Sequence, residues 1–319
     1  MRLVFFGSDV FALPALEALV AAGHELALAV TNPDRRRGRS KALLPTPIKE
    51  TALRLGAPVE QPEERPGRAL AARIAEVGAE LGVVVAYGQF LTKRVREAPS
   101  LGYSINLHGS LLPRWRGAAP VAAALLAGDP VTGVSVQRVE QRMDAGPLLL
   151  SREEVVRPDD DRGALRDRLS QLGAELLVEA VAAIARGEAA FVAQDEALAT
   201  LAPKLSKEDG QLDLAGDAAR LAREVRAFTP WPGAFLTLAG GERVQVVRAL
   251  ALETPSEGPS EGTAPGTVLA LDKERESLRV AAGSGALELL TLKPVGKRDM
   301  SGLAFANGRR LKPGDRVLA

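Results

Sequence analysis

Three polar side chains in the first half of the sequence have the types and the spacing that transfer of an acyl group requires. Asn106 and His108 stand two residues apart at the end of the apolar stretch YSINLHG, and Asp144 precedes a turn-forming Ala-Gly-Pro. Residues i and i+2 of a strand point to the same side, so the carboxamide and the imidazole are expected to face one crevice. A carboxamide can donate a hydrogen bond to an oxygen that becomes negative, and a carboxylate can orient an imidazole or take a proton from an attacking amine. This set favours acyl transfer to an amine.

Structural roles for the same residues are the alternative. A histidine at a strand end can be a core residue that is bonded to a neighbouring carbonyl, and an aspartate before Gly-Pro can simply form a turn. The chain has only two histidines, His24 and His108. A histidine at the end of a strand and beside Gly109 therefore favours the functional interpretation.

Other chemistries lack the residues that they need. The sequence has no cysteine and no G-x-S-x-G motif, which argues against a covalent acyl-enzyme. Ser110 is the only hydroxyl to consider near the set, and a serine before Leu-Leu-Pro is more often structural. Two distant histidines without cysteine predict no metal site. The first turn reads GSDVFA rather than G-x-G-x-x-G, and no Walker A motif is present, so dinucleotide and P-loop nucleotide binding are not expected.

The elements that must position this set alternate between strands and helices. Apolar runs predict strands at 2–6, 25–31, 81–86, 103–108 and 132–139, with helices at about 14–22, 46–55 and 67–77 and after Gly117. This alternation indicates an α/β domain with a Rossmann-like, mostly parallel sheet. Parallel strands end at one edge of a sheet, so the loop that carries Asp144 is expected to lie beside His108.

The second half of the chain has a different character. A strand at 147–156 and a long amphipathic helix at 162–186 are predicted, and the regular pattern then fades between residues 187 and 205. One further helix, at about 216–228, is followed by short strands with Gly and Pro turns, which predict a small β-barrel, closed or open and OB-like. The predicted division is a catalytic domain at 1–188, a linker at 189–205 and a β-barrel domain at 206–319.

Basic residues are concentrated in two stretches, although the formal net charge is only +1. One stretch lies within residues 32–45, which have no apolar period and are predicted to form a long loop. The other lies near the C-terminus. Two such regions suit a polyanion that touches both domains, with an ordinary solvated surface as the alternative. The basic residues of the first stretch are Arg35, Arg36, Arg37, Arg39 and Lys41.

The bulk composition is that of a soluble globular protein. The 319 residues are 46% hydrophobic and 25% charged, and this length suits two domains. The sequence has no cysteine, no signal-peptide layout in its first residues MRLVFFGSDV, and no apolar run long enough to span a bilayer. These features predict a cytoplasmic protein without a membrane segment.

The central motif resembles a known family. INLHGSLLPRWRGAAP, followed by GVSVQRVEQRMDAGPLL, is similar to the signature of the folate-dependent formyltransferases. The resemblance continues in VFFGSDVFALP, NPDRRRGRSKALLPTPIK and VVVAYGQFL, and in KLSKEDGQLDL and VRAFTPWPGAF of the second domain. The central motif is shared by members that formylate glycinamide ribonucleotide or amino sugars. The second domain resembles that of the members that formylate methionyl initiator tRNA.

The resemblance implies N10-formyltetrahydrofolate as the formyl donor and the α-amino group of methionyl initiator tRNA as the acceptor, without a metal. It implies that Asn106, His108 and Asp144 are catalytic, and that the basic loop meets the acceptor end of the tRNA, with Arg39 as the arginine to single out. A monomer is expected. The folate site is implied to be lined by Ser110, Leu111, Leu112 and Pro113, with the backbone of Tyr87, Gly88, Gln89, Phe90 and Leu91 holding the pterin.

Two departures from the family and two other functions stay open. Extra arginines at 35–37 leave the choice of the critical arginine open, and Trp115 stands where a tyrosine is common. A formyltransferase or formyl-folate hydrolase that acts on a small-molecule amine, such as an amino-sugar nucleotide, is the nearest alternative. An RNA-binding protein that has lost catalysis is the alternative from another class.

Overall fold

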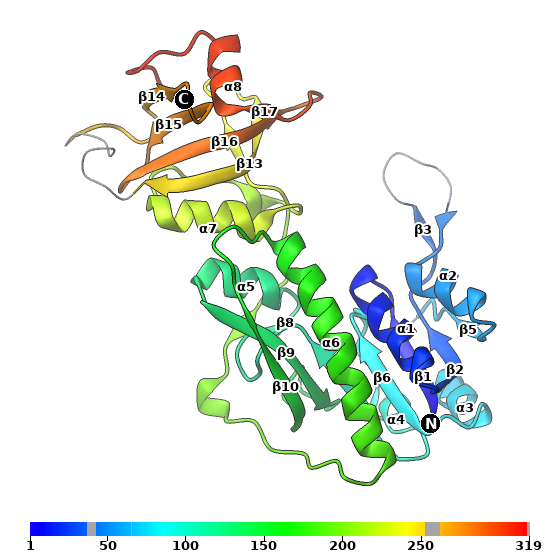
Figure 1. Cartoon of the computed structure of the whole chain (residues 1–319). Helices are drawn as coiled ribbons and strands as arrows, with labels where there is room; N and C mark the ends of the chain where they lie inside the picture. The colour runs from blue at the N-terminus through cyan, green and yellow to red at the C-terminus, as the bar shows by residue number, and fades with distance from the viewer. Residues whose placement is uncertain (37–42, 65, 253–261, 318–319) are drawn as a thin grey trace. The chain divides into compact units, whose positions relative to one another are not determined.

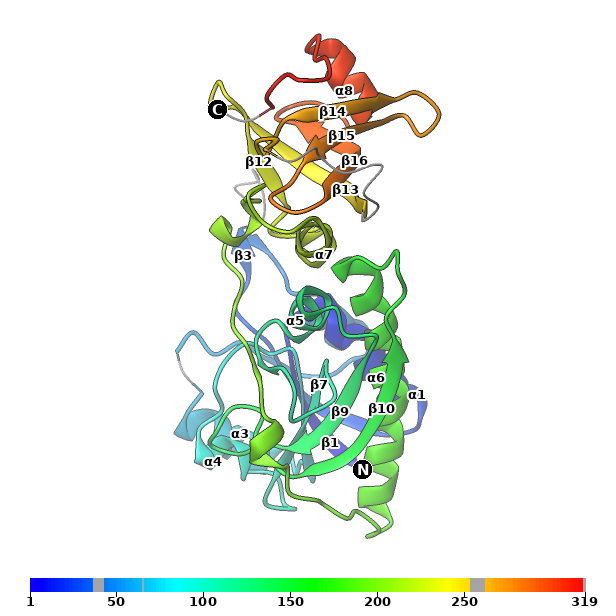
Figure 2. The same ribbon diagram turned by 90° about the vertical axis from the view of Figure 1, so that its left-hand side faces the viewer.

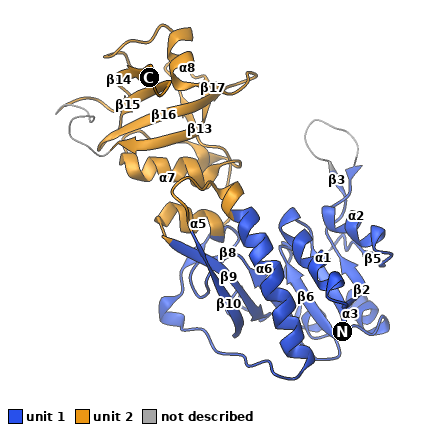
Figure 3. Ribbon diagram, viewed as in Figure 1, with its two compact units in different colours: residues 1–120, 131–155, 166–203 blue, residues 121–130, 156–165, 204–319 orange. Residues whose placement is uncertain are grey.

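The structure is a computed structural model that describes residues 1–36, 43–64, 66–252 and 262–317 (Figure 1). The chain divides into two compact units (Figure 3). The first comprises residues 1–120, 131–155 and 166–203, and the second comprises residues 121–130, 156–165 and 204–319. None of the helices in the described ranges has the length and apolarity needed to cross a bilayer.

A seven-stranded, mostly parallel sheet forms the centre of the first unit, as the sequence predicts. Its order is β10-β9-β7-β6-β1-β2-β5. The strands from β7 to β5 are parallel, whereas β9 pairs antiparallel with both β7 and β10. The strand bounds are β1 Arg2–Gly7, β2 Glu25–Val30, β5 Val59–Glu60, β6 Leu81–Val85, β7 Ser104–His108, β9 Val131–Arg138 and β10 Leu148–Val155.

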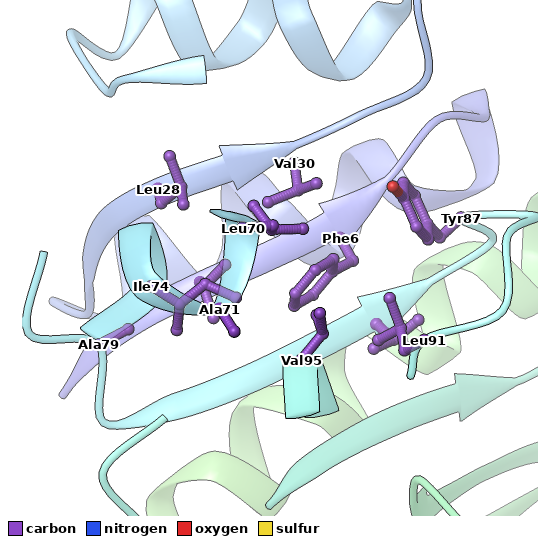
Figure 4. Packing of buried hydrophobic residues seen from close by; sticks show 12 residues of the cluster. Phe6, Leu28, Val30, Leu70, Ala71, Ile74, Ala79, Tyr87, Leu91 and Val95 are labelled. Carbon is purple, nitrogen blue, oxygen red and sulfur yellow. The ribbon is translucent and has the colours of Figure 1, made fainter. Parts of the chain in front are cut away.

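Helices cover both faces of this sheet. Helices α1 (Leu13–Ala21) and α6 (Arg162–Ala185) lie on one face, and α3 (Arg68–Glu76) and α4 (Lys93–Arg96) lie on the other (Figures 1 and 2). Figure 4 shows side chains of β1, β2, α3 and α4 packed into a core on the second face. The inner strands β1, β2 and β6 are buried on both sides, which explains why their sequences read as apolar runs.

The prediction of a long loop at 32–45 is wrong in part. Two short strands, β3 (Arg35–Arg36) and β4 (Leu43–Leu44), pair antiparallel within it. Helix α2 (Pro47–Arg54) follows at once, because Thr46 caps it by accepting a hydrogen bond from the Lys49 N–H and Pro47 occupies the first turn. An arginine-rich segment with no apolar period gave no local signal for this ribbon.

The chain after α6 crosses back over the first unit. It contains the 3₁₀ turn η2 (Glu196–Leu198) and the strand β11 (Leu201–Ala202). Strand β11 pairs in parallel with β8 (Arg116–Gly117), which lies just after β7. Elsewhere in the first unit, the short 3₁₀ turn η1 (Val10–Ala12) lies between β1 and α1. Residues 192–202, called the crossing segment below, are thus hydrogen-bonded to the stretch that follows β7.

The second unit is built on an antiparallel sheet, as predicted. The strand order is β12-β13-β16-β15-β14, and the end strands β12 and β14 are not paired with each other in the described chain. Helix α7 (Ala218–Phe228) packs on β13 and β16. The sequence reading missed β17 and α8. The remaining bounds are α5 Pro120–Ala127, η3 Glu208–Gly210, β12 Phe235–Thr237, β13 Arg243–Leu252, β14 Val268–Asp272, β15 Ser277–Ala281, β16 Ala286–Pro294, β17 Met300–Ser301 and α8 Gly302–Gly308.

Candidate active site

Asn106 and His108 lie on one face of the sheet at the end of β7. Asn106 is directly opposite Gln137 of β9, and His108 is directly opposite Ser135. Directly opposed residues of an antiparallel pair project to the same side, so all four side chains share this face. His108 is buried, with 6% of its surface exposed. The half-buried Asn106 carboxamide makes no hydrogen bond to another described residue.

Asp144 lies beside this pair. Its Oδ2 is 3.6 Å from Nδ1 of His108. The Gly117 N–H donates to Oδ2 at 2.9 Å, and the Gln137 side-chain amide donates to Oδ1 at 3.1 Å. Both carboxylate oxygens are therefore oriented by uncharged donors, and one of them faces the imidazole. Catalytic contacts of this length are common before substrate binds.

The sequence analysis expected parallel strands to bring Asp144 beside His108, and this explanation is wrong. The strand before Asp144, β9, is antiparallel to β7, and its last residue, Arg138, pairs with Ile105 near the start of β7. The chain that follows therefore leaves β9 at the wrong end for a parallel arrangement. It reaches His108 because residues 139–147 fold back over the face of the sheet, where the Gln137 side chain bonds Asp144. Where this loop of residues 139–147 ends, the Arg138 N–H donates to the Pro147 carbonyl.

The Trp115 carbonyl selects the tautomer of His108. His108 Nε2 lies 2.9 Å from this carbonyl oxygen, which can only accept a hydrogen bond. Nε2 therefore carries a proton, and Nδ1 is the nitrogen that faces Asp144. The carbonyl contact matches the structural alternative for this histidine, yet it leaves Nδ1 available for chemistry.

Backbone strain gathers around the same place. Five non-glycine residues of the described chain have a positive φ, and three of them adjoin the predicted site. They are Ala86 at 46°, Trp115 at 61° and Asp144 at 51°. Such residues persist where surrounding bonds over-determine the backbone, and they are frequent at functional sites.

The predicted folate segment at 110–113 is fixed onto β9. The buried Ser110 hydroxyl donates to the Arg114 carbonyl at 2.6 Å, which gives that hydroxyl a structural partner. Ser135 accepts from the Leu112 N–H and donates to the Ser110 carbonyl. Leu112 is buried, whereas Leu111 and Pro113 are partly exposed. Ser135, which the sequence reading did not single out, is thus the anchor of this turn.

The second predicted folate segment follows β6. Tyr87 and Leu91 belong to the core, and the Tyr87 ring packs edge-on against Phe6 with centroids 5.7 Å apart (Figure 4). The Tyr87 hydroxyl has no hydrogen-bond partner among the described residues, and burial raises the pKa of Tyr87 to about 12. Gly88, Gln89 and Phe90 lie nearer the surface. No atom lies within 4 Å of the place where a Cβ of Gly88 would stand.

The base of the basic loop is bonded to this segment. The Asn32 side chain donates to the Tyr87 carbonyl and accepts from Gln89. Asp34 is held by Lys49 and Gln61, and the hydrogen bond from Lys49 is the main cause that lowers the pKa of Asp34. Arg35 is exposed, and Arg36 lies in the same strand. The predicted tRNA contacts Arg37, Arg39 and Lys41 lie outside the described residues.

Sequence reasoning missed the residues that support Asp144. Gln137 could have been found, because it stands at an inward position of a predicted strand. Gln194 could not, since it lies where no regular pattern exists; its side chain donates to the carbonyls of Asp144 and Gly146. Arg116 in turn donates to Gln194.

Comparison with known proteins agrees with this geometry. Residues 1–181 match the sequence profile of the formyl transferase family, and residues 204–310 match its C-terminal domain. Two curated relatives are named methionyl-tRNA formyltransferase. The one from Methylococcus capsulatus is 43% identical over 311 residues and 98% of each chain, and the one from Parvibaculum lavamentivorans is 42% identical over 320 residues, 99% of this chain and 100% of the relative.

The fold is also found in a solved structure. HypX from Aquifex aeolicus, in complex with tetrahydrofolic acid, aligns with a TM-score of 0.63 at 18% identity. The alignment covers 96% of this chain and 47% of HypX, so this chain spans about half the length of HypX. The profile matches to both halves and the full-length identity to the two relatives show that the chain belongs to the formyl transferase family.

Proposed function

We propose that this chain transfers a formyl group from N10-formyltetrahydrofolate to the α-amino group of methionyl initiator tRNA. The observation that carries the proposal is the 43% identity to a methionyl-tRNA formyltransferase over 98% of both chains, second domain included. The placement of Asp144 against His108 supports the same reaction class.

The reaction forms a bond between the carbonyl carbon and the attacking amine and breaks its bond to the nitrogen of the donor. One proton leaves the amine and one reaches the departing nitrogen. In the proposed roles, His108 Nδ1 and the Asp144 carboxylate hold and move this proton, because Nε2 is already bonded to Trp115. The free carboxamide of Asn106 donates to the carbonyl oxygen as that oxygen gains negative charge.

The residues present fit a folate donor, which supplies the activated formyl group. Tyr87 brings a buried hydroxyl that has no partner in the described part of the chain, and the backbone at Gly88 is open to a flat ring. We propose that residues 87–91 hold the pterin and that Ser110, Leu111, Leu112 and Pro113 line the site. Since the Ser110 hydroxyl is already bonded, its contribution is through the fixed turn.

The acceptor is proposed to be bound through its phosphates. Arg35, Arg36, Arg37, Arg39 and Lys41 would supply the positive charge of the first domain, and contacts of this kind make binding dependent on salt. Replacing Arg39 with alanine is expected to raise KM for tRNA while affinity for folate stays nearly constant. Arg54→Ala, at an exposed arginine at the end of α2, is the matched control. Equal losses on tRNA and folate would instead assign the loop to the folate pocket.

Domain limits, assembly and location follow as further parts of the proposal. The chain is expected to act as a monomer in the cytoplasm, with domains at 1–188 and 206–319 joined at 189–205. A formyltransferase or hydrolase for a small amine is disfavoured, because a small acceptor needs neither the basic loop nor the second domain.

A formyl-transfer assay with matched initiator and elongator methionyl-tRNAs tests the proposed function. Folate-dependent formylation of the initiator, with much weaker use of the elongator, is expected. Activity on an amino-sugar nucleotide with none on tRNA would reject the proposal. An unimpaired biological activity in His108→Ala would favour a non-catalytic RNA-binding role.

A further inference from the structure

The crossing segment, residues 192–202, is attached to the catalytic face at both of its ends. At the first end, Val192 and Leu148 exchange backbone hydrogen bonds at 2.7 and 2.8 Å. At the other end, β11 pairs with β8, and the Thr200 hydroxyl accepts from the Trp115 N–H. The stretch between these attachments is therefore held across the loop that carries Asp144.

Gln194 stands two residues after the first attachment and contacts that loop directly. Its amide nitrogen lies 2.9 Å from the Asp144 carbonyl, 2.7 Å from the Gly146 carbonyl and 3.1 Å from Oε1 of Gln137. Two N–H groups are thus shared among three acceptors. These bonds hold the backbone on both sides of the strained Asp144, whose φ is 51°.

Arg116 dictates which way the Gln194 amide points. The Arg116 guanidinium donates to the Gln194 oxygen at 3.1 and 2.7 Å, and it donates to Glu196 at 3.1 and 3.0 Å. A guanidinium has no acceptor, so the oxygen of Gln194 must face it and the nitrogen must face the carbonyls. Arg116 is buried, with 4% of its surface exposed, which keeps this arrangement away from competing water.

The orientation of the Gln194 amide also fixes the orientation of the Gln137 amide. Since Oε1 of Gln137 accepts from Gln194, its own nitrogen is turned toward the Asp144 carboxylate, where it donates at 3.1 Å. A directed chain therefore runs from Arg116 through Gln194 and Gln137 to the carboxylate. Arg116 stays protonated and the two glutamines do not titrate, so Asp144 is the only member of this chain that can exchange the proton of the reaction.

We propose that Gln194, oriented by Arg116, is the positioning residue that holds the Asp144 carboxylate against His108. The role of Asp144 in transfer rests on the proposed function, whereas the geometric part does not. Gln194, which lies in the stretch that the sequence predicts as a linker, thereby becomes part of the support of the proposed active site.

The variants Gln194→Ala and Gln194→Glu test this role. Glutamate keeps the volume but cannot donate to the two carbonyls, so it should do no better than alanine. In both variants kcat is expected to fall roughly 10- to 100-fold, as misplacement of a catalytic group does. KM for methionyl-tRNA should stay within about twofold, since no substrate contact is lost. Asp195→Ala is the matched control, because among the described residues that side chain bonds only the nearby Ala197 N–H.

A spectroscopic measurement keeps the proposal independent of activity. The chain has two histidines, so ¹⁵N spectra contain His108 as the reporter and His24 as an internal reference. Gln194→Ala should move the ring signals of His108 and leave those of His24. In an Asp144→Asn background, Gln194→Ala should move neither the His108 signals nor the His24 signals.

The outcomes separate the two proposals. Wild-type kcat in Gln194→Glu, or unmoved His108 signals in a folded Gln194→Ala protein, would overturn the positioning role. A fall in kcat accompanied by an equal loss in Asp195→Ala would do the same. If the wild-type protein formylates no tRNA while the His108 signals still move as described, the proposed function fails and the positioning of Asp144 stands.

Discussion

Two carboxylates that are withdrawn from water, one in each unit, are held in opposite ways. The Asp144 side chain is 14% exposed and, within the described chain, accepts only from uncharged groups, the Gly117 N–H and the Gln137 amide, with His108 at 3.6 Å. Glu288, on β16, is 0% exposed. It accepts from the Ser277 hydroxyl and lies 3.0 Å from Arg275 and 3.5 Å from Arg279.

The difference separates a carboxylate available for chemistry from one used for structure. Glu288 is compensated by the neighbouring cations Arg275 and Arg279, so its charge serves to hold β15 and β16 together. Asp144 is oriented by neutral donors, so its charge acts on the imidazole and on whatever enters beside it. Its backbone is strained, and the backbone of a residue within a regular strand such as Glu288 is not. Orientation without neutralisation is the feature that distinguishes the proposed active site.

The largest effect is expected for Asp144→Asn. This substitution keeps the volume and removes the charge, so kcat should fall by roughly 10²–10⁴-fold, the usual contribution of a proton-transfer group. An asparagine can accept from only one of the two donors, so a stability loss of about 1 kcal/mol is expected. Steady-state kinetics and urea denaturation measure the two quantities. Turnover at the wild-type rate would remove Asp144 from the reaction.

Glu288→Gln should give the reverse pattern. The glutamine can still accept from Ser277, but Arg275 and Arg279 lose their anion. A buried pair broken on one side destabilises strongly, and because Arg275 is 47% exposed and can turn to water we expect a loss of about 2 kcal/mol. The kcat of the folded protein should not change. If Asp144→Asn cost as much stability as Glu288→Gln, the distinction between the two carboxylates would not hold.

Much of the first unit could be predicted from the sequence because its signals are local. A strand buried on both faces reads as an apolar run, as in β1 and β6, and α6 shows its amphipathic face over its whole length. Asn106 and His108 could be placed together because residues two positions apart on a strand share a face. The direction of β9 was not available in this way, because a buried strand reads the same in either direction. Asp144 was therefore expected in the right place for a wrong reason.

The support of Asp144 could not be predicted because it depends on pairing between distant segments. Gln194 and Arg116 are 78 residues apart, and the stretch around Gln194 has neither a strand nor a helix period. The backbone bonds of β8 with β11 and of Leu148 with Val192 bring them together. The short ribbon of β3 and β4 was missed for the same reason: two-residue strands carry almost no periodicity.

The smallest expected effect concerns Glu196, which pairs with arginines as Glu288 does but is exposed. Hydrogen bonds from Arg116, and secondarily from Arg142, lower the pKa of Glu196 from its ordinary 4.5 to about 2. A lowered pKa in the folded state means that the ionised carboxylate stabilises the fold above about pH 4.5, and that this contribution is lost as the pH falls toward 2. The difference in Tm between the wild type and Glu196→Gln should therefore be constant near neutral pH and shrink over this acid range.

The difference should be small because half of the Glu196 side chain is in contact with water, where ion pairs contribute little. Thermal unfolding followed by circular dichroism at a series of pH values measures it. A difference that stays the same from pH 7 to pH 3 would show that Glu196 does not act through its charge. A difference as large as that of Glu288→Gln would show that burial is not what separates a structural ion pair from a surface one. Glu288 would then no longer serve as the structural counterpart to Asp144.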